Sequence, residues 1–172
     1  MAISSSSYVV YRNYVAFWGS EFSNFHPCSF KLDGIVWKSS EQYFMAKKAL
    51  HFKDNETYQK ILKADTPKEA KALGRQVKMF DPDVWSAVCE EYMYRGVYAK
   101  FSQNEDLKKL LLSDYLRDKH FVEGSPVDNI WGCGIKYDDP RIDDKANWTG
   151  ANLLGKTLDR VRTELLAESQ RL

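Results

Sequence analysis

An acidic and a basic side chain seven residues apart, Glu41 and Lys48, are the first pair in the sequence that could do chemistry together. If this segment is helical, the two side chains share one face and lie roughly 10 Å apart along the axis. That spacing is too wide for an i,i+4 ion pair and suits a carboxylate and an amine that flank a ligand, as general acid and nucleophile. Lys47 points about 100° away and is expected to be solvated. The alternative is structural: Glu41 complements the helix N-terminus and Lys48 extends from the edge of the core.

A second group with chemical potential lies between Glu123 and Gly134. Asp128 and Trp131 stand there among small residues, which suits a pocket wall that stacks on a ring-shaped ligand and aims a carboxylate inward. The alternative is an Asx-type turn at Asp128 followed by a core tryptophan.

Two further segments could hold an anion. Gly150-Ala151-Asn152 precedes an amphipathic pattern, and an asparagine N-cap followed by exposed backbone amides favours anion binding. The spacing of a phosphate-cradling loop is missing, so a simple helix cap is the alternative. Gly74-Arg75 follows a predicted helix end, and the arginine fork fits phosphate or carboxylate. A surface arginine that balances the helix C-terminus is the alternative.

Turn and capping residues predict the elements that must position these groups. Asp33-Gly34 predicts a β-hairpin within a strand-like region from Tyr8 to Trp37. Ser39, with Gln42 three residues on, predicts the N-cap of the helix that carries Glu41 and Lys48. Capping and periodicity predict further helices from Thr66-Pro67 to Leu73, from Pro82 to Phe101, around 107–112 and from Asn152 to Leu166.

The stretch from Phe121 to Thr149 is too long for a simple connection, which is typical of a functional segment. Its Trp131 and Trp148 argue against disorder. We find no repeat and no linker, and expect one domain over residues 8–172 after a disordered tail at 1–7. We expect this domain to be α+β and mainly α, an orthogonal helical bundle with a small antiparallel sheet near the N-terminus.

Composition excludes several classes of protein. The net charge of +1 over 172 residues argues against a protein that coats nucleic acid non-specifically. The three cysteines have no CxxC spacing, so we expect no zinc site, no disulfide framework and a reducing compartment. Residues 1–7 lack the pattern of a signal peptide, and no apolar run approaches a membrane span. These observations predict an intracellular protein, cytoplasmic or nuclear.

Read together, these segments resemble the NADAR family, also called YbiA-like. The resemblance covers about residues 14 to 166, nearly the whole chain, and each block is short but follows the family's order. One departure is Gln42, where many members carry histidine, so that a histidine there is not required and base selectivity is expected to differ. The matching blocks are Phe17, Phe22-Ser23-Asn24-Phe25, Asp33-Gly34 with Trp37, Ser40 to Lys48, Gly74-Arg75, Trp85, Ala99-Lys100-Phe101 with Asn104 and Leu107, Val122 to Gly134, and Gly150 to Gly155.

The resemblance implies a YbiA-like fold and an enzyme that cuts N-glycosidic bonds of phosphoribosyl or ADP-ribosyl conjugates. The implied substrate is ADP-ribosylated guanine in DNA or RNA, or the free nucleotide. We expect no metal, no cofactor, no membrane partner and a monomer. Lys48 would be the catalytic lysine, with Glu41 and Asp128 as acid/base or ribose-orienting carboxylates. The implied substrate-binding residues are Trp18, Ser23, Asn24, Gly74, Arg75, Trp85, Trp131, Gly132 and Asn152.

The hypothesis for the mechanism is covalent catalysis by an amine. A Lys48 buried against Phe44 and the tryptophans would have a lowered pKa and a free lone pair for attack on the anomeric carbon. An alternative keeps Lys48 as a cation that stabilises an oxocarbenium-like transition state. Two other functions stay open: hydrolysis of a phosphoribosyl-amine intermediate of riboflavin biosynthesis, and reading of ADP-ribose without turnover.

Overall fold

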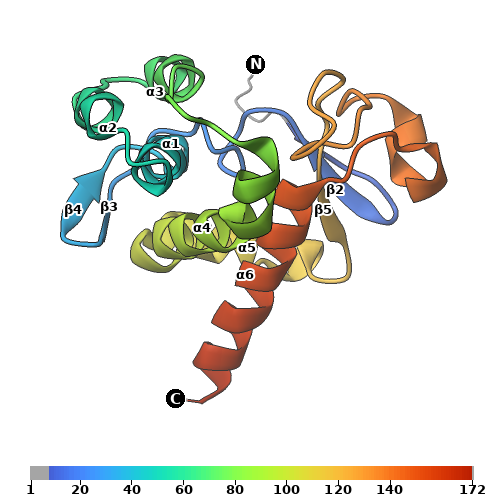
Figure 1. The fold of residues 1–172 in the computed structure, drawn as a ribbon. Coiled ribbons are helices and arrows are strands. Elements are labelled where there is room, and N and C mark those ends of the chain that lie inside the picture. The colour runs from blue at the N-terminus through green and yellow to red at the C-terminus, as the bar shows by residue number, and fades with distance from the viewer. Residues whose placement is uncertain (1–7, 172) are drawn as a thin grey trace. The chain divides into compact units, whose positions relative to one another are not determined.

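The computed structural model describes residues 8–171, so the predicted tail at 1–7 lies outside the described range. The chain divides into two compact units, which we treat separately (Figure 1). The sheet unit comprises Met1–Ser23 and Glu105–Leu172, and the helical unit comprises Asn24–Asn104. Helices account for about 52% of the structure, which confirms the prediction of a mainly α protein. A single domain over residues 8–172 stays a prediction.

The helical unit begins with the predicted hairpin. β3 (Phe30–Leu32) pairs antiparallel with β4 (Ile35–Trp37). Asp33 and Gly34 have φ of 54° and 77°, the left-handed pair that a two-residue turn of this twist requires. The hairpin prediction is confirmed, and the turn fixes where Asp33 projects.

Helix α1 (Ser40–His51) follows the hairpin and carries the candidate pair. The side chain of Ser39 accepts the backbone N–H of Gln42 at 3.1 Å, which confirms the predicted cap. Eight residues of α1 are buried, so this helix forms the centre of the unit. It packs against α2 (Asn55–Leu62), α3 (Pro67–Gly74) and α4 (Pro82–Gln103).

Capping residues set the starts of the other three helices. Asp54, Thr66 and Asp81 each accept backbone N–H groups at the N-terminus of α2, α3 and α4, respectively. Pro67 and Pro82 occupy the first helical position, where a missing N–H costs nothing. The predicted starts of α3 and α4 are confirmed, whereas α2 was not predicted.

The sheet unit contains three strands in the order β1-β2-β5. β1 (Tyr8–Val10) is antiparallel to β2 (Tyr14–Phe17), as predicted for the N-terminal strands. β5 (His120–Glu123) adds a parallel partner to β2, with Tyr14 opposite His120. The sequence gives no local signal for this pairing, because the two strands are more than 100 residues apart.

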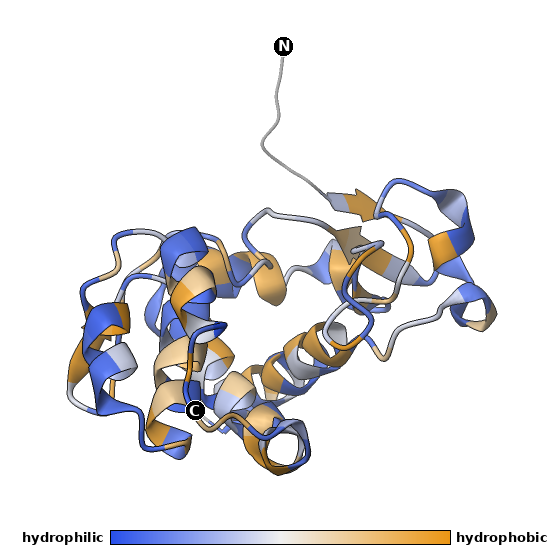
Figure 2. Cartoon of the chain, turned by 45° about the horizontal axis from the view of Figure 1, so that its top comes forward, coloured by the Kyte–Doolittle hydropathy of each residue, from blue (hydrophilic) through white to orange (hydrophobic). Residues whose placement is uncertain are grey.

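Helical elements complete the sheet unit. The longest is α6 (Leu153–Gln170), which packs on β5 and buries Leu154, Leu158, Val161 and Leu165. Figure 2 shows hydrophobic and hydrophilic residues alternating along the helices, as expected when one face of a helix is buried. The shorter elements are α5 (Glu105–Leu111), η1 (Asp114–Leu116), η2 (Pro140–Asp143) and η3 (Lys145–Asn147).

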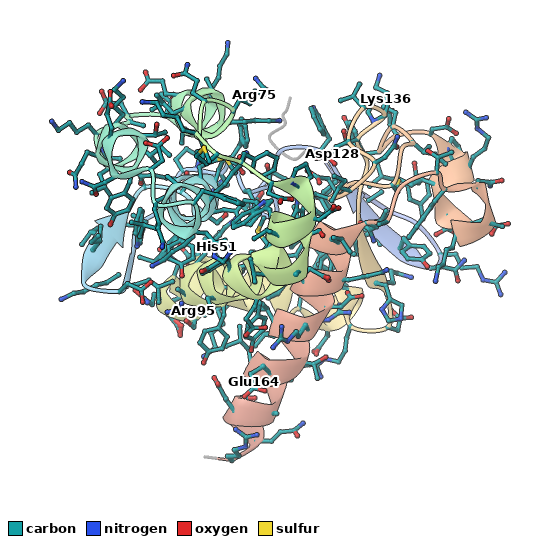
Figure 3. The ribbon with its side chains drawn as sticks, in the orientation of Figure 1. His51, Arg75, Arg95, Asp128, Lys136 and Glu164 are labelled. Atoms are coloured by element: carbon teal, nitrogen blue, oxygen red, sulfur yellow. The ribbon has the colours of Figure 1, made fainter. Side chains whose placement is uncertain are left out.

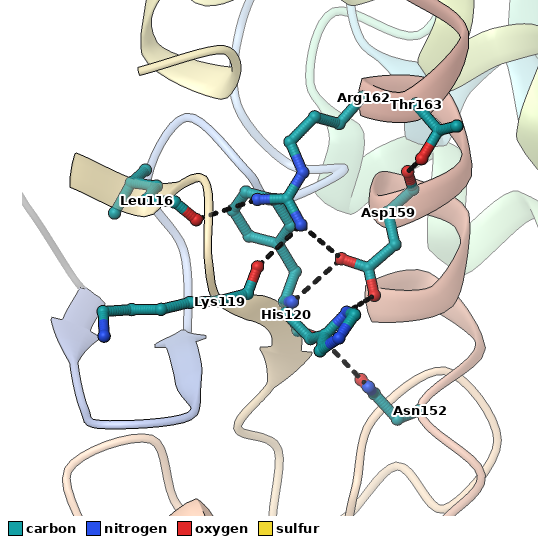
Figure 4. A network of polar contacts seen from close by, with 8 residues as sticks. Leu116, Lys119, His120, Asn152, Asp159, Arg162 and Thr163 are labelled. Atoms are coloured by element: carbon teal, nitrogen blue, oxygen red, sulfur yellow. Dashed lines mark hydrogen bonds and ion pairs between the residues drawn. The ribbon is translucent and has the colours of Figure 1, made fainter. Parts of the chain in front are cut away.

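A polar network centred on Arg162 and Asp159 of α6 joins this helix to β5, to η1 and to the turn after η1 (Figure 4). Arg162 donates to the carbonyls of Leu116 at 3.0 Å and Lys119 at 2.6 Å, and lies 3.4 Å from the Asp159 carboxylate. Asp159 also accepts the backbone N–H of Phe121 and contacts Nδ1 of His120 at 2.9 Å. Burial raises the pKa of Asp159 and lowers that of Arg162, so each charge depends on these partners. The network therefore serves the packing of the sheet unit.

Within residues 8–171, none of the helices combines the length and apolarity needed to cross a lipid bilayer.

Candidate functional site

Lys48 lies in the last turn of α1 and is half-buried. Its Nζ stands 4.3 Å from the centroid of the Phe80 ring. Burial lowers the pKa of Lys48, the Glu41 carboxylate opposes this effect, and Arg75 adds to it. More of this amine is therefore neutral near neutral pH than of an exposed lysine, which is the property a nucleophilic amine needs.

Glu41 lies in the first turn of the same helix and is only 8% exposed. Its backbone N–H donates to the carbonyl of Asn24 at 3.1 Å. The Ser40 hydroxyl donates to Oδ1 of Asn24 at 2.8 Å, and the Asn24 amide contacts the sulfur of Met93. Asn24, predicted as a substrate contact, is thus buried and fixes the start of α1. The backbone that carries Glu41 is fixed in this way, and a buried carboxylate on a fixed helix start is suited to general acid–base work.

An aromatic cluster lies beside Lys48. Trp85 stacks on Tyr92 with centroids 5.7 Å apart and planes at 21°, and Phe44 packs on Trp85 at 5.2 Å. The ring beneath the ammonium group is that of Phe80, and the expectation that Lys48 also lies against Phe44 and the tryptophans stays a prediction. We define the aromatic cluster as Phe44, His51, Phe52, Phe80, Trp85 and Tyr92.

Arg75 and Gly74 have different roles in the structure. Arg75 is the C-cap of α3, is exposed and acts on the charge of Lys48 (labelled with His51 in Figure 3). Gly74 is buried where α3 crosses α1, and a Cβ there would overlap the sulfur of Met45. The structure thus explains Gly74 by packing, whereas binding of an anionic ligand by Arg75 stays a prediction.

The structure contradicts the prediction that Lys47 is solvated. Its Nζ lies 2.6 Å from Oδ2 of Asp33, and its side chain is only 15% exposed, so it is not solvated. Burial would raise the pKa of Asp33, but Lys47 and Arg95 outweigh that effect and lower it. The hairpin turn brings Asp33 to α1, a tertiary contact that helical spacing alone does not reveal.

Gln42, the departure from the family pattern, has a structural explanation. Its side chain accepts the N–H of Lys38 at 2.8 Å and donates to the carbonyl of Ile61 at 3.1 Å. These bonds fasten α1 to the end of α2, and the side chain is 3% exposed. The residue therefore supports the helix that carries Lys48, and nothing in its contacts ties it to base selectivity.

In the sheet unit, the predicted anion site at the start of α6 is wrong. The N–H groups of Ala151, Asn152, Leu153 and Leu154 all donate to carbonyls of the segment 129–132, at 2.8 to 3.1 Å. These first-turn amides are therefore used by protein and cannot receive an anion. We call the paired segments 129–133 and 149–154 the backbone clamp.

Asn152 is the N-cap residue of α6 by position, but its side chain makes no cap bond. Its φ is 52°, and its amide group accepts the N–H of Glu123 at 2.9 Å and donates to the carbonyl of Phe121 at 3.0 Å. Asn152 thus joins α6 to β5. It was predicted to bind substrate, and that role stays a prediction.

Asp128 forms the Asx-type turn that the sequence left as an alternative. Its Oδ1 accepts the N–H groups of Ile130 and Trp131, each at 2.9 Å. Gly132 is buried, and a Cβ there would come within 2.8 Å of the Asp128 carbonyl. A catalytic role for Asp128 stays a prediction.

The remaining predicted residues of the sheet unit differ in exposure. Trp18 is 49% exposed and Ser23 is 7% exposed, whereas Trp131 is half-buried. Their roles in substrate binding stay predictions.

A pocket of about 720 Å³ opens in the sheet unit and contains none of the predicted site residues. Asp143 in its wall accepts the backbone N–H groups of Asn13 and Tyr14, so this carboxylate anchors a turn. Pocket size therefore does not point to the predicted site residues, and the catalytic role of Lys48, whose pKa is lowered, stays a prediction. The pocket is lined by Arg12, Asn13, Tyr14, Asp118, His120, Pro140, Arg141, Asp143, Asp144, Lys145 and Asn147.

Sequence reasoning missed Phe80, His51 and Tyr92. His51 lies three residues after Lys48, on the same side of α1, and its Nδ1 contacts the Tyr92 hydroxyl at 3.2 Å. Helical spacing could have found His51. Phe80 precedes the cap of α4 and carries no local signal of its contact with Lys48. Over residues 8–171, we find no group of three or more histidine, cysteine, aspartate or glutamate side chains able to hold a metal ion.

In the helical unit, a buried carboxylate and a lysine of lowered pKa lie on one helix, in a chain that is mainly helical. The model of the NADAR domain matches residues 16–166, so the chain belongs to the NADAR family. The solved NMR structure of the E. coli protein YbiA has a TM-score of 0.76 and 29% identity to this chain, and the match covers 96% of this chain and 92% of that one. The expected YbiA-like fold is confirmed.

Similar proteins from other organisms support the same family assignment. "N-glycosidase R617" of Acanthamoeba polyphaga mimivirus is 40% identical over 148 residues, covering 83% of this chain and 86% of that protein. "Protein irg-1" of Caenorhabditis elegans is 39% identical over 160 residues, with coverage of 84% and 74%. "Riboflavin biosynthesis protein VVA0006" of Vibrio vulnificus is 34% identical, but the match covers 35% of its length.

Proposed function

We propose that this chain is an N-glycosidase that releases ADP-ribose from a guanine base, with Lys48 as nucleophile and Glu41 as proton donor. One observation carries the proposal: a half-buried amine of lowered pKa shares α1 with a buried carboxylate. Membership of the NADAR family, with relatives named N-glycosidase, supports a glycosyl hydrolase as the reaction class. The guanine and ADP-ribose parts of the proposal rest on the family resemblance.

The first chemical step joins Lys48 to the sugar. The lone pair of Nζ forms a bond to the anomeric carbon of the ribose while the bond from that carbon to the guanine nitrogen breaks. The electron pair of the broken bond stays on the guanine nitrogen, which takes a proton from Glu41. General acid help of this kind is worth about 10²–10⁴-fold.

The second step opens the ribose ring of the adduct and hydrolyses its bond to Lys48. The secondary ammonium nitrogen formed by the attack loses one proton, the ring C–O bond breaks with its electrons on oxygen, and that oxygen takes the proton. The nitrogen of Lys48, which keeps its other proton, becomes a protonated Schiff base. Water adds to the carbon, and the amine leaves with its electron pair. The products are free ADP-ribose, which closes to its ring form, and regenerated Lys48. The sum is hydrolysis, so no oxidant or cofactor is consumed.

Borohydride trapping tests the covalent step. The protein is incubated with single-stranded DNA that carries ADP-ribosylated guanine, reduced with borohydride and mapped by peptide mass spectrometry. We expect one reduced ADP-ribose adduct, on Lys48. The control is Lys47→Arg, which keeps the charge beside Asp33 and leaves the adduct in place. An adduct on another residue, or turnover without any adduct, overturns the lysine mechanism.

Lys48→Arg separates a nucleophile from a cation. Arginine stays protonated, so it abolishes attack by an amine but retains the charge that stabilises an oxocarbenium-like transition state. We expect no turnover from Lys48→Arg. Substantial residual turnover supports the electrostatic mechanism instead.

A second candidate function is hydrolysis of a phosphoribosyl-amine intermediate of riboflavin biosynthesis. The relative named riboflavin biosynthesis protein favours it. Comparing kcat/KM on the modified oligonucleotide and on that intermediate decides between the two substrates. A non-catalytic reader of ADP-ribose is the candidate from another class, and it predicts tight binding of free ADP-ribose with no loss of the mark over time.

A further inference from the structure

Phe80 has an open aromatic face that Lys48 occupies. The ring is 41% exposed, and Nζ of Lys48 lies 4.3 Å from its centroid. Phe52 meets the ring edge-on, with centroids 5.3 Å apart and planes at 73°. Phe80 therefore packs against Phe52 while one face of its ring carries the ammonium group.

Two anchors hold the chain on either side of Phe80. The N–H of Lys78 donates to Oδ2 of Asp54 at 2.9 Å, and Oδ1 of Asp81 accepts the N–H of Asp83 at 2.9 Å. Between them, Met79 has a φ of 59° and is 87% exposed. A non-glycine residue in the left-handed region is kept there only when its surroundings impose it. The turn thus presents Phe80 from fixed ends rather than burying it.

The face of Phe80 has two competing uses. A cation over an aromatic ring is stabilised by the ring quadrupole, which favours protonated Lys48 and opposes the effect of burial. Attack on a sugar carbon needs the neutral amine. An aromatic face also stacks on planar bases of any sequence. The same face cannot hold the ammonium and a base together.

We propose that Phe80 is the platform for the leaving base: a planar nitrogen heterocycle stacks on its ring, displaces the Lys48 ammonium and so shifts the amine toward its neutral form. This inference rests on the proposed function for the nucleophilic role of Lys48. It adds a specificity rule, because a conjugate whose leaving group is not planar cannot displace the ammonium. Phe80 then selects the substrate and activates the nucleophile in one event.

Amine labelling without turnover tests the contact. The rate at which an acylating reagent modifies Lys48 is measured against pH by peptide mass spectrometry, relative to its plateau at high pH, so that access and charge are separated. Phe80→Leu keeps an apolar side chain but removes the quadrupole. We expect the relative rate at neutral pH to rise about two- to tenfold in Phe80→Leu. The charged neighbours that act on Lys48, Glu41 and Arg75, are unchanged in this variant.

The matched control is Phe25→Leu. Phe25 is 38% exposed and carries its own lysine, Lys71, with Nζ 5.6 Å from the ring centroid. The Phe25→Leu variant should leave the labelling profile of Lys48 unchanged. Guanosine is then added as the probe of stacking: it should raise the relative rate in the wild type and have no effect in Phe80→Leu. An unchanged profile in Phe80→Leu, or a guanosine effect that persists without the ring, overturns the proposal.

The turnover profile gives a second readout. The acid limb of kcat/KM reports the free enzyme and that of kcat reports the complex. In the wild type we expect the kcat limb at lower pH, because the base has displaced the ammonium. In Phe80→Leu we expect the two limbs to coincide and KM to rise. If no substrate is turned over and no adduct forms, the proposed function fails, whereas the labelling result still decides whether a base displaces Lys48 from Phe80.

Discussion

The Lys48 site and the backbone clamp use polar groups in opposite ways. In the helical unit, Lys48 is half-buried over an aromatic ring, and the pKa of its amine is lowered. In the sheet unit, the amides at the start of α6 and the Oδ1 of Asp128 are bonded to backbone groups of the same unit. The first region holds a reactive group in a destabilising environment, and the second uses its polar groups to hold chain segments together.

This difference shows how short sequence blocks should be interpreted. Glycine, aspartate and asparagine suggest a functional site because they recur in phosphate sites. In and beside the backbone clamp, however, close approach and turns explain them. The spacing of Glu41 and Lys48 left a structural alternative open, yet the pKa of Lys48 is lowered. Variants in both regions can test whether function and stability separate in this way.

Glu41→Gln should have the largest effect. The change keeps the shape of the side chain and removes the proton donor, so we expect kcat to fall by about 10²–10⁴-fold. The Glu41 carboxylate favours the ammonium form of Lys48, so its loss should also move the acid limb of the pH–rate profile to lower pH. Steady-state kinetics across pH measure both effects.

The control for Glu41 is Glu56→Gln. Glu56 also lies in the first turn of a helix but is exposed and pairs with Lys60 and Lys78. It should change kcat by less than about twofold, because exposed pairs contribute little. A Glu41→Gln variant as active as this control would remove Glu41 from the chemistry.

Gly155→Ala should be the most damaging change for stability in the sheet unit. A Cβ at this position would overlap the carbonyl oxygen of Phe121, so α6 must move away from β5. We expect a loss of about 1–3 kcal/mol in the free energy of unfolding from the overlap, although alanine is the better helix former by about 1 kcal/mol. Denaturant unfolding measures this loss, and kcat per folded molecule should stay near the wild-type value.

Lys156→Ala is the adjacent control. Lys156 is exposed on the same helix, so its replacement should leave stability within about 0.5 kcal/mol. If Gly155→Ala were equally silent, close approach would not explain the glycine, and the separation between the two regions would weaken.

Local rules predicted the elements whose causes are local. The turn at Asp33-Gly34, the caps at Ser39 and Thr66 and the helix start at Pro82 depend on a few neighbouring residues, and all were found. The pairing of β2 with β5 depends on strands far apart in the chain, so no window of sequence contains it. Prediction failed where tertiary contacts decide the outcome.

The candidate site follows the same rule. Glu41 and Lys48 were found because helical spacing is local. Phe80 was missed because its contact with Lys48 depends on the turn between α3 and α4. Asn152 was assigned as a cap from its position, but its side chain forms hydrogen bonds with backbone groups of β5.

Asp128→Asn should have a smaller effect on stability than Asp128→Ala. The asparagine side chain keeps an oxygen that can accept both turn amides, so we expect a change within about 0.5 kcal/mol, whereas alanine should lose about 1 kcal/mol. Thermal unfolding measures the difference. A hundredfold fall in kcat for Asp128→Asn at unchanged stability would show that Asp128 acts in the reaction as well as in the turn. The contrast between the two regions would then fail.

Lys48→Met should have the smallest effect on stability, and its sign is informative. Because the folded-state pKa of Lys48 is lowered, the folded protein binds the lysine proton less tightly than the unfolded chain does. Below the folded pKa the ammonium is a net cost to folding, and that cost disappears as the pH rises from the folded pKa to about 10.5, the unfolded value. Lys48 is only half-buried, so after solvent screening we expect methionine to stabilise the protein by a few tenths of a kcal/mol at neutral pH, with no turnover. Unfolding by denaturant at pH 7 and near pH 10 measures the change. The comparison is Lys47→Met, which should instead destabilise the protein because it removes the ion pair at 2.6 Å and leaves Arg95 as the cation paired with Asp33. If Lys48→Met were destabilising at pH 7 and neutral at high pH, the fold would favour the ammonium form. Such a result would contradict a lowered pKa for the Lys48 amine.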